Sequence, residues 1–133
     1  MVSCSVKFSF EAAHRLPEHT GKCHFLHGHS YRGEVYVTGP VLGNGMVMDF
    51  SDLKRVINKV VSTLDHKTIL RYDDPLRECL KAGGFEDSVF FIAETPTAET
   101  LVALIAGALL CEDLLVEAVQ LNETEDNAAI WRA

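Results

Sequence analysis

The chain has 133 residues, of which 47% are hydrophobic and 23% are charged, a composition typical of one globular domain with a core of its own. The formal net charge of −7 disfavours a nucleic-acid-binding protein, which would carry a basic stripe, and it disfavours adhesion to anionic membranes. The first ten residues contain no apolar leader, and the longest apolar run, residues 101–111, is too short to cross a bilayer. We therefore expect a single domain over residues 1–133, located in the cytoplasm.

The first part of the chain predicts two strands joined by a loop. Apolar and polar side chains alternate over residues 5–13, which is the period of a half-buried strand. Residues 15–28 contain proline and glycine and are typical of a loop, and the alternation returns over residues 29–39. A tight turn is expected at residues 43–45 (GNG), and residues 46–50 can add a short strand segment.

Helices dominate the predicted middle of the chain. Apolar residues at helical spacing indicate a helix over residues 51–64, with Ser51 as its N-cap, and another over residues 97–111, capped by Thr97. A short helix is expected between them, from residue 73 to residue 81. Further strands are expected at residues 89–92 (alternatively a buried loop), 115–124 and 127–132.

Strands before and after a group of helices favour an α+β fold. The element order is expected to be ββααββ. It predicts a four-stranded antiparallel sheet with the helices on one face.

Three histidines are the candidate ligands of one metal ion. His27 and His29 flank Gly28 and share a face of an extended strand, because side chains alternate along a strand. His14 continues the apolar parity of the first strand at its end. Three neutral imidazoles with an open fourth position form the catalytic zinc arrangement, not the closed structural one. His19 and His24, both in the predicted loop, are alternative ligands.

Other polar residues are candidates for catalysis. Cys23 lies between Lys22 and His24, and a neighbouring cation or metal favours the thiolate, the form that acts as a base or nucleophile. A second candidate is the pair Asp65 and His66, in which the carboxylate can hold the imidazole in one tautomer.

Glu123 is a further candidate, this time for ligand binding. Along the predicted strand it falls on the same face as the apolar residues. Its carboxylate therefore points inward and needs a partner, such as a ligand with paired N–H donors. A strand-end glutamate near solvent is the alternative.

Six motifs, taken together, resemble those of one enzyme family. They are residues 8–14 (FSFEAAH), 23–29 (CHFLHGH), 48–50 (MDF), 64–66 (LDH), 96–99 (PTAE) and 122–124 (NET). In this order and spacing they are similar to the family of 6-pyruvoyltetrahydropterin synthase and 6-carboxytetrahydropterin synthase. The resemblance spans nearly the whole chain.

This resemblance implies the tunnelling fold (T-fold), in which strands of several protomers close a barrel as a trimer or a stacked hexamer. It implies a zinc ion on His14, His27 and His29. The implied catalytic residues are Cys23, Asp65 and His66, and the implied substrate-binding residues are Glu123, Thr97 and Glu99. The resemblance also implies a pterin as the substrate. Sites in this family lie between subunits, so a homo-oligomer is expected, with no nucleic acid or membrane as partner.

The Cys-x3-His-Gly-His spacing is similar to that of the bacterial 6-carboxytetrahydropterin synthases of queuosine (7-deazaguanine) biosynthesis. The implied reaction converts 7,8-dihydroneopterin triphosphate to 6-carboxytetrahydropterin, acetaldehyde and triphosphate. One alternative is a 6-pyruvoyltetrahydropterin synthase. An alternative from another class is a non-catalytic zinc-binding structural protein.

Two features of the sequence leave the substrate details open. Arg15, Lys22 or Lys67 could supply positive charge to the triphosphate. The segment of residues 71–93 is longer than the corresponding segment of the shortest family members. It could cover the pocket or lie on the outer surface.

Overall fold

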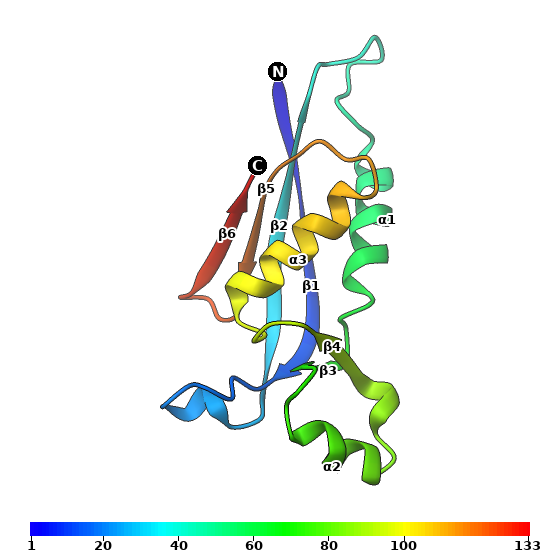
Figure 1. The fold of residues 1–133 in the computed structure, drawn as a ribbon. Coiled ribbons are helices and arrows are strands. Elements are labelled where there is room, and N and C mark those ends of the chain that lie inside the picture. The colour runs from blue at the N-terminus through cyan, green and yellow to red at the C-terminus, as the bar shows by residue number, and fades with distance from the viewer.

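The computed structural model describes all 133 residues, and a six-stranded mixed sheet with the strand order β4-β3-β1-β2-β5-β6 lies at its centre (Figure 1). The strands are β1 (Val2–His14), β2 (His27–Gly39), β3 (Lys67–Arg71), β4 (Val89–Ile92), β5 (Val116–Asn122) and β6 (Ala128–Arg132). The helices are α1 (Phe50–Val61), α2 (Leu76–Ala82) and α3 (Ala98–Leu110), with short 3-10 helices η1 (Lys22–His24) and η2 (Glu86–Ser88). The predicted α+β class is confirmed.

A long antiparallel hairpin of β1 and β2 is the central feature of the sheet. Each strand has 13 residues, and they pair from Val2 opposite Gly39 to His14 opposite His27. Even positions of β1 and odd positions of β2 form the buried face of the hairpin, whereas the polar side chains between them are exposed or half-buried. This division follows directly from the alternation in the two sequences.

The prediction of a four-stranded antiparallel sheet in the order ββααββ is wrong. Strand β3 runs parallel to β1, and β4 runs parallel to β3, so the sheet has six strands and is mixed. Parallel neighbours need crossover connections, which α1 and α2 provide. Strand β3 has only five residues and follows closely after α1, so its pattern is too short to distinguish a strand from the end of a helix.

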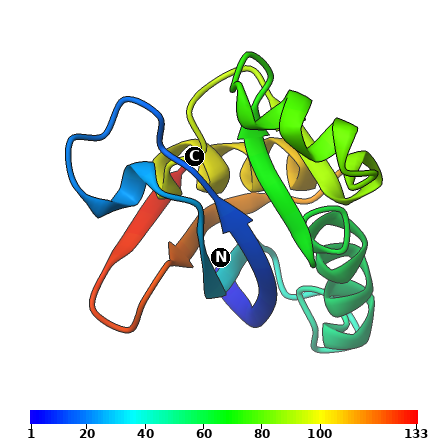
Figure 2. The same cartoon turned by 90° about the horizontal axis from the view of Figure 1, so that it is seen from below.

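Helices α1 and α3 lie on the same side of the curled sheet and contact each other, as the view from below shows (Figure 2). Their apolar stripes meet the buried face of β1 and β2 in one core of 23 buried residues. Helices α1 and α3 are therefore on one face of the sheet, as predicted. No helix combines the length and the apolar character needed to cross a membrane.

Helix starts follow their capping residues. Thr97 caps α3, as predicted, because its side chain accepts a hydrogen bond from the backbone N–H of Thr100 at 3.2 Å. The cap of α1 is Asp49 and not the predicted Ser51, since the Asp49 carboxylate accepts from the Ser51 N–H at 2.7 Å. Residues 46–49 lead irregularly into this cap, so the strand segment predicted there is absent.

Gly33 in β2 tests how tightly the buried face is packed. A Cβ atom there would collide with the Phe8 ring and the Gln120 carbonyl, so Gly33→Ala should lower the free energy of unfolding by about 2 kcal/mol. The control is Gly107→Ala in α3, where a Cβ meets nothing within 4 Å; it should raise that free energy by about 1 kcal/mol. Urea unfolding at one protein concentration measures both, and an unchanged midpoint for Gly33→Ala would contradict this packing.

Candidate metal centre

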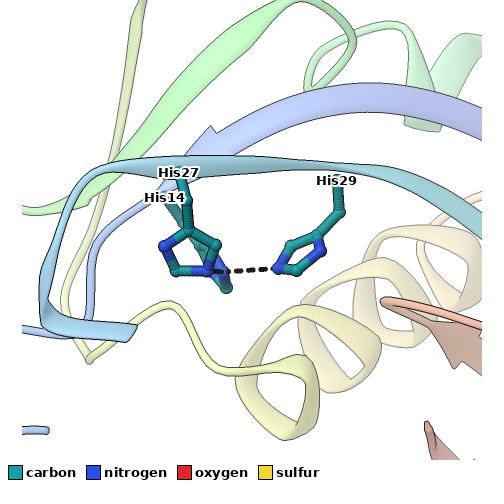
Figure 3. A group of neighbouring side chains, drawn as sticks. All are labelled: His14, His27 and His29. Carbon is teal, nitrogen blue, oxygen red and sulfur yellow. Dashed lines mark hydrogen bonds between the residues drawn. The ribbon is translucent and has the colours of Figure 1, made fainter. Parts of the chain in front are cut away.

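Three histidines meet at one end of the β1–β2 hairpin, on its buried face. His14 ends β1, His27 begins β2 as its register partner, and His29 follows two residues later. The Nε2 atom of His14 lies 3.0 Å from that of His27 and 3.2 Å from that of His29. The three rings point toward one another, with the first turn of α3 nearby (Figure 3). The strand periodicity therefore brings together the three side chains that the sequence predicts as ligands.

Backbone carbonyls fix the orientation of two of these rings. The Nδ1 atom of His14 donates to the Pro96 carbonyl at 2.7 Å, and Nδ1 of His27 donates to the Phe25 carbonyl at the same distance of 2.7 Å. A carbonyl can only accept, so both Nδ1 atoms carry the proton and both Nε2 atoms of the neutral rings carry a lone pair. Metal-binding histidines typically donate their other ring N–H to a backbone carbonyl or a carboxylate in this way.

Burial keeps the imidazoles of His14 and His29 neutral. The pKa of His14 is lowered to about 4, chiefly because the ring is buried, and the hydrogen bond to Pro96 offsets this only in part. Burial also lowers the pKa of His29, against the opposing effect of Glu123. At neutral pH both rings therefore have the uncharged form that a metal requires.

The donor set fits a divalent metal ion. Two lone pairs facing each other at 3.0 Å repel unless a cation or a proton lies between them. The ligand atoms of the three histidines all lie within 4.8 Å of one another, and no cysteine or carboxylate joins the group. Three imidazole ligands without a fourth side chain leave a position for water or substrate. The predicted alternatives are outside it: Nδ1 of His19 and Nδ1 of His24 both bond to the backbone of Gly21.

Glu123 directly follows β5 and faces the three histidines. This is the side on which the alternation along the strand predicts its side chain. Its Oε1 atom lies 3.9 Å from Nε2 of His14, and its side chain is 25% exposed. The carboxylate is thus near the histidines and open to solvent at the same time. That position suits a group that contacts a bound ligand.

Cys23 lies in η1, within the loop that joins β1 to β2, and is half-buried. Its carbonyl accepts a hydrogen bond from the Leu16 N–H at 3.0 Å. The carbonyl of His24, the next residue, accepts from the Arg15 guanidinium at 3.3 Å. Two bonds from the residues that follow His14 therefore hold the turn that carries this thiol.

The pair Asp65 and His66 is held by the backbone of β1. The Asp65 carboxylate accepts from the Glu11 N–H and from Nδ1 of His66, each at 2.9 Å, and these two bonds hold the pKa of Asp65 below its usual range. The backbone N–H of His66 donates to the Glu11 carbonyl at 2.6 Å. With a left-handed φ of 61°, uncommon for a residue other than glycine, His66 turns outward and is 78% exposed.

The Asp65–His66 pair and the three histidines each contribute one residue to the same hollow but are not bonded to each other. His66 and His29 both line an open hollow of about 410 Å³. No hydrogen bond within the chain joins His66 or Asp65 to Cys23 or to the three histidines. Within this one chain, the predicted site residues therefore do not form a single bonded group.

The motif at residues 96–99 contributes to the centre mainly through its backbone. Pro96 supplies the carbonyl that holds His14, while the Thr97 side chain caps α3 and Glu99 is exposed in the first turn of that helix. Tyr31 is not among the predicted site residues, but its hydroxyl lies 3.2 Å from Nδ1 of His14. Its place two residues after His29, on the same face of β2, was the available signal.

Two of the cations proposed for an anionic substrate are already engaged. The Arg15 guanidinium forms a two-point ion pair with Asp74, at 3.0 Å for each nitrogen, and Nζ of Lys67 donates to the Asp87 carbonyl at 2.9 Å. Lys22 forms no ion pair within the chain and is exposed.

Fold and site together define an α+β protein with an open three-histidine centre at the end of a curled sheet. The sequence profile of the 6-pyruvoyl tetrahydropterin synthase family matches residues 3–133. The chain therefore belongs to this family, and it is an enzyme of the lyase type. Membership in a family of enzymes disfavours the alternative of a non-catalytic metal-binding protein.

Two relatives illustrate the similarity in sequence. A putative 6-carboxy-5,6,7,8-tetrahydropterin synthase from Archaeoglobus fulgidus is 38% identical over 124 residues, which cover 93% of this chain and 90% of the relative. The 6-carboxy-5,6,7,8-tetrahydropterin synthase from Haemophilus influenzae is 37% identical over 134 aligned residues, covering 93% and 94%.

Solved structures show the same fold. The structure of Caenorhabditis elegans 6-pyruvoyl tetrahydropterin synthase matches with a TM-score of 0.74 and 26% identity, covering 99% of this chain and 95% of that one. An uncharacterized protein from Wolinella succinogenes matches with a TM-score of 0.84 at 20% identity, covering 98% and 97%. The predicted tunnelling fold is confirmed.

Removal of one ligand tests the metal centre. His14→Ala should weaken binding of Zn²⁺ or Co²⁺ by more than the 10- to 100-fold that is typical when a residue hydrogen-bonded to a ligand is removed. The reason is that the buried His14 ring is the one that both other Nε2 atoms approach. His24→Ala should bind either ion as the unaltered protein does. Titration with Co²⁺, followed by its visible absorption, measures both, and equal affinities would mean that the metal binds elsewhere.

Proposed function

We propose that this enzyme is a zinc-dependent 6-carboxy-5,6,7,8-tetrahydropterin synthase. It would convert 7,8-dihydroneopterin triphosphate and one water to 6-carboxytetrahydropterin, acetaldehyde and triphosphate, in the cytoplasm and in queuosine biosynthesis. The observation that carries the proposal is the three-histidine centre beside Glu123, in a chain whose relatives of 37–38% identity bear this name. Four free cysteines fit a reducing compartment.

His14, His27 and His29 would hold the zinc ion. When bound, zinc would act as a Lewis acid that lowers the pKa of the substrate's side-chain hydroxyls. The protein's part is to hold the His14 and His27 rings in fixed tautomers, which the Pro96 and Phe25 carbonyls do.

Proton transfer falls to Cys23 and to the Asp65–His66 pair. Cys23, as the thiolate, would remove the proton from the side-chain carbon next to the pterin ring. In the pair, Nδ1 of His66 is bonded to the ionised Asp65, so that Nε2 is the atom free to exchange a proton with the substrate.

Glu123 would bind the pterin itself. A carboxylate pairs well with the adjacent N–H donors of the 2-amino group and the ring nitrogen, since each of its two oxygens can accept one hydrogen bond. The position of Glu123 near His14 would place the substrate side chain toward the metal. Thr97 and Glu99, at the start of α3, would border the same pocket.

The separation between the dyad and the metal ligands in one chain supports a homo-oligomer. Because His66 is 78% exposed and contacts none of the other proposed catalytic groups, a neighbouring protomer is the natural source of the second half of each site. We therefore propose a trimer, or two stacked trimers, with active sites between subunits.

A 6-pyruvoyltetrahydropterin synthase is the second candidate, because it would use the same residues and differ in product. The Caenorhabditis elegans structure, 26% identical, favours it. The higher identity to the carboxy enzymes and the Cys-x3-His-Gly-His spacing favour the first.

Product analysis separates the two functions. The zinc-loaded protein is incubated with 7,8-dihydroneopterin triphosphate, and the products are identified by mass spectrometry. Acetaldehyde together with 6-carboxytetrahydropterin is expected. A product that retains the three-carbon side chain would move the enzyme to the pyruvoyl branch, and no turnover at all would refute both.

Cys23→Ala tests the proposed base. The variant should bind zinc normally, because the thiol is outside the ligand group, and should lose at least about 100-fold in kcat, within the range typical of a general base. Cys111→Ala, at the far end of α3, is the matched control and should retain full activity. Full activity of Cys23→Ala would show that another group removes the proton.

A further inference from the structure

We propose that Arg15, held in place by Asp74, is a positioning residue that fixes the Cys23 turn relative to the metal ligands. Here the Cys23 turn means residues 21–25, which include η1. The inference rests on the proposed function, in which Cys23 is the base. It also gives residues 71–93 a role that neither the family membership nor the metal centre supplies.

Three consecutive residues link the metal ligand to the thiol. His14 ends β1 with its ring in the metal group, Nη1 of Arg15 donates to the His24 carbonyl at 3.3 Å, and the N–H of Leu16 donates to the Cys23 carbonyl at 3.0 Å. Any displacement of Arg15 would therefore move the Cys23 turn against His14. The loop of residues 15–26 has no strand partner along this stretch, so these two bonds tie the Cys23 turn directly to the residues that follow His14.

Asp74 fixes Arg15 more firmly than a surface ion pair could. Its side chain is fully buried, and its two oxygens accept from Nε and Nη2 of Arg15, each at 3.0 Å. The carboxylate also accepts from the Leu76 N–H at 2.9 Å, at the start of α2. A planar guanidinium bound at two points has one orientation, which a lysine ammonium would not have. That orientation directs the remaining nitrogen, Nη1, at the His24 carbonyl.

A second arginine, Arg71, connects residues 71–96 to the loop of residues 15–26 and to the metal centre. Nη1 of Arg71 donates to the Glu18 carboxylate at 3.0 Å and to the Thr95 hydroxyl at 3.2 Å. Thr95 directly precedes Pro96, whose carbonyl holds the His14 ring. The segment of residues 71–96 thus contacts the loop of residues 15–26 through two ion pairs, Arg15–Asp74 and Arg71–Glu18. It contacts His14 through the Pro96 carbonyl.

Residues 71–93 therefore serve as a support for the loop, and none of them lines the hollow shared by His29 and His66. Because Arg15 binds Asp74 with two nitrogens and the His24 carbonyl with the third, its charge is engaged inside the protein. The structure accordingly favours a positioning role for Arg15 over a role in binding the triphosphate.

The test uses Arg15→Gln, Arg15→Lys and Asp74→Asn in the full-length, zinc-loaded enzyme, with 7,8-dihydroneopterin triphosphate as substrate. For Arg15→Gln and Asp74→Asn we expect unchanged zinc content, a KM within about twofold, and a kcat reduced about 10- to 100-fold, because misplacement of a reacting group by 1 Å costs on that order. Arg15→Lys should fall between Arg15→Gln and the unaltered enzyme. The double variant should be no slower than the slower single variant, since both changes break one unit.

Hydrogen exchange provides a readout that does not depend on turnover. The Leu16 amide, which donates to Cys23, should exchange at least about tenfold faster in Arg15→Gln and Asp74→Asn, while the amides of the β1–β2 hairpin keep their protection. Arg55→Gln, which breaks an exposed ion pair with Asp52 on α1, is the matched control and should change neither kcat nor the exchange of Leu16.

Each outcome decides the inference. A raised KM with unchanged kcat would show that Arg15 binds substrate, and unchanged kcat and exchange in an active enzyme would show that Arg15 positions nothing; both results overturn it. If the unaltered enzyme does not turn over this substrate, the proposed function fails, while the Leu16 exchange still tests the support of the turn. If Arg15→Gln does not fold, Asp74→Asn and Arg15→Lys carry the test.

Discussion

The rest of the site depends on the pairing of His14 with His27 across the β1–β2 hairpin. This pairing puts the last residue of one strand opposite the first residue of the next, so two imidazoles project from the same face, and the strand period adds His29. The hairpin is anchored by the core that α1 and α3 cover. The chemistry is thus placed where the regular backbone ends and an irregular loop begins, which gives the ligands rigidity on one side and leaves room for a substrate on the other.

Backbone groups, more than side chains, organise the polar residues around this pairing. The Pro96 and Phe25 carbonyls fix two imidazoles, both backbone groups of Glu11 hold Asp65 and His66, and the loop carbonyls receive the bonds that place Cys23. Such bonds survive changes of side chain. They also require that the loops keep their course, and the ion pair between Arg15 and the buried Asp74 helps to hold one of them.

Much of this arrangement could be predicted from the sequence, because it follows from periodicity. Alternation in residues 5–13 and 29–39 predicts the hairpin and its buried face, and the same parity directs His14, His29 and Glu123 inward. Strand β3 could not be predicted, since its five residues follow closely after a helix and contain two adjacent buried residues, Ile69 and Leu70, in place of an alternation. The Arg15–Asp74 pair could not be predicted either, because it joins residues 59 positions apart whose contact arises only from the β3–α2 crossover. The positive φ of His66 likewise depends on its bond to Glu11 and not on its own sequence.

The in-register hairpin has a consequence for folding. A shift of the β1–β2 pairing by one residue would turn every histidine of β2 to the other face, and a shift by two would separate His14 from His27 by about 7 Å along the strand. A metal ion that needs all three imidazoles would therefore bind the correctly paired chain and reject the shifted ones. By mass action it would draw a mixture of pairings toward the native one. An ion bound at the three histidines would thus also favour the correct register of the sheet that carries them.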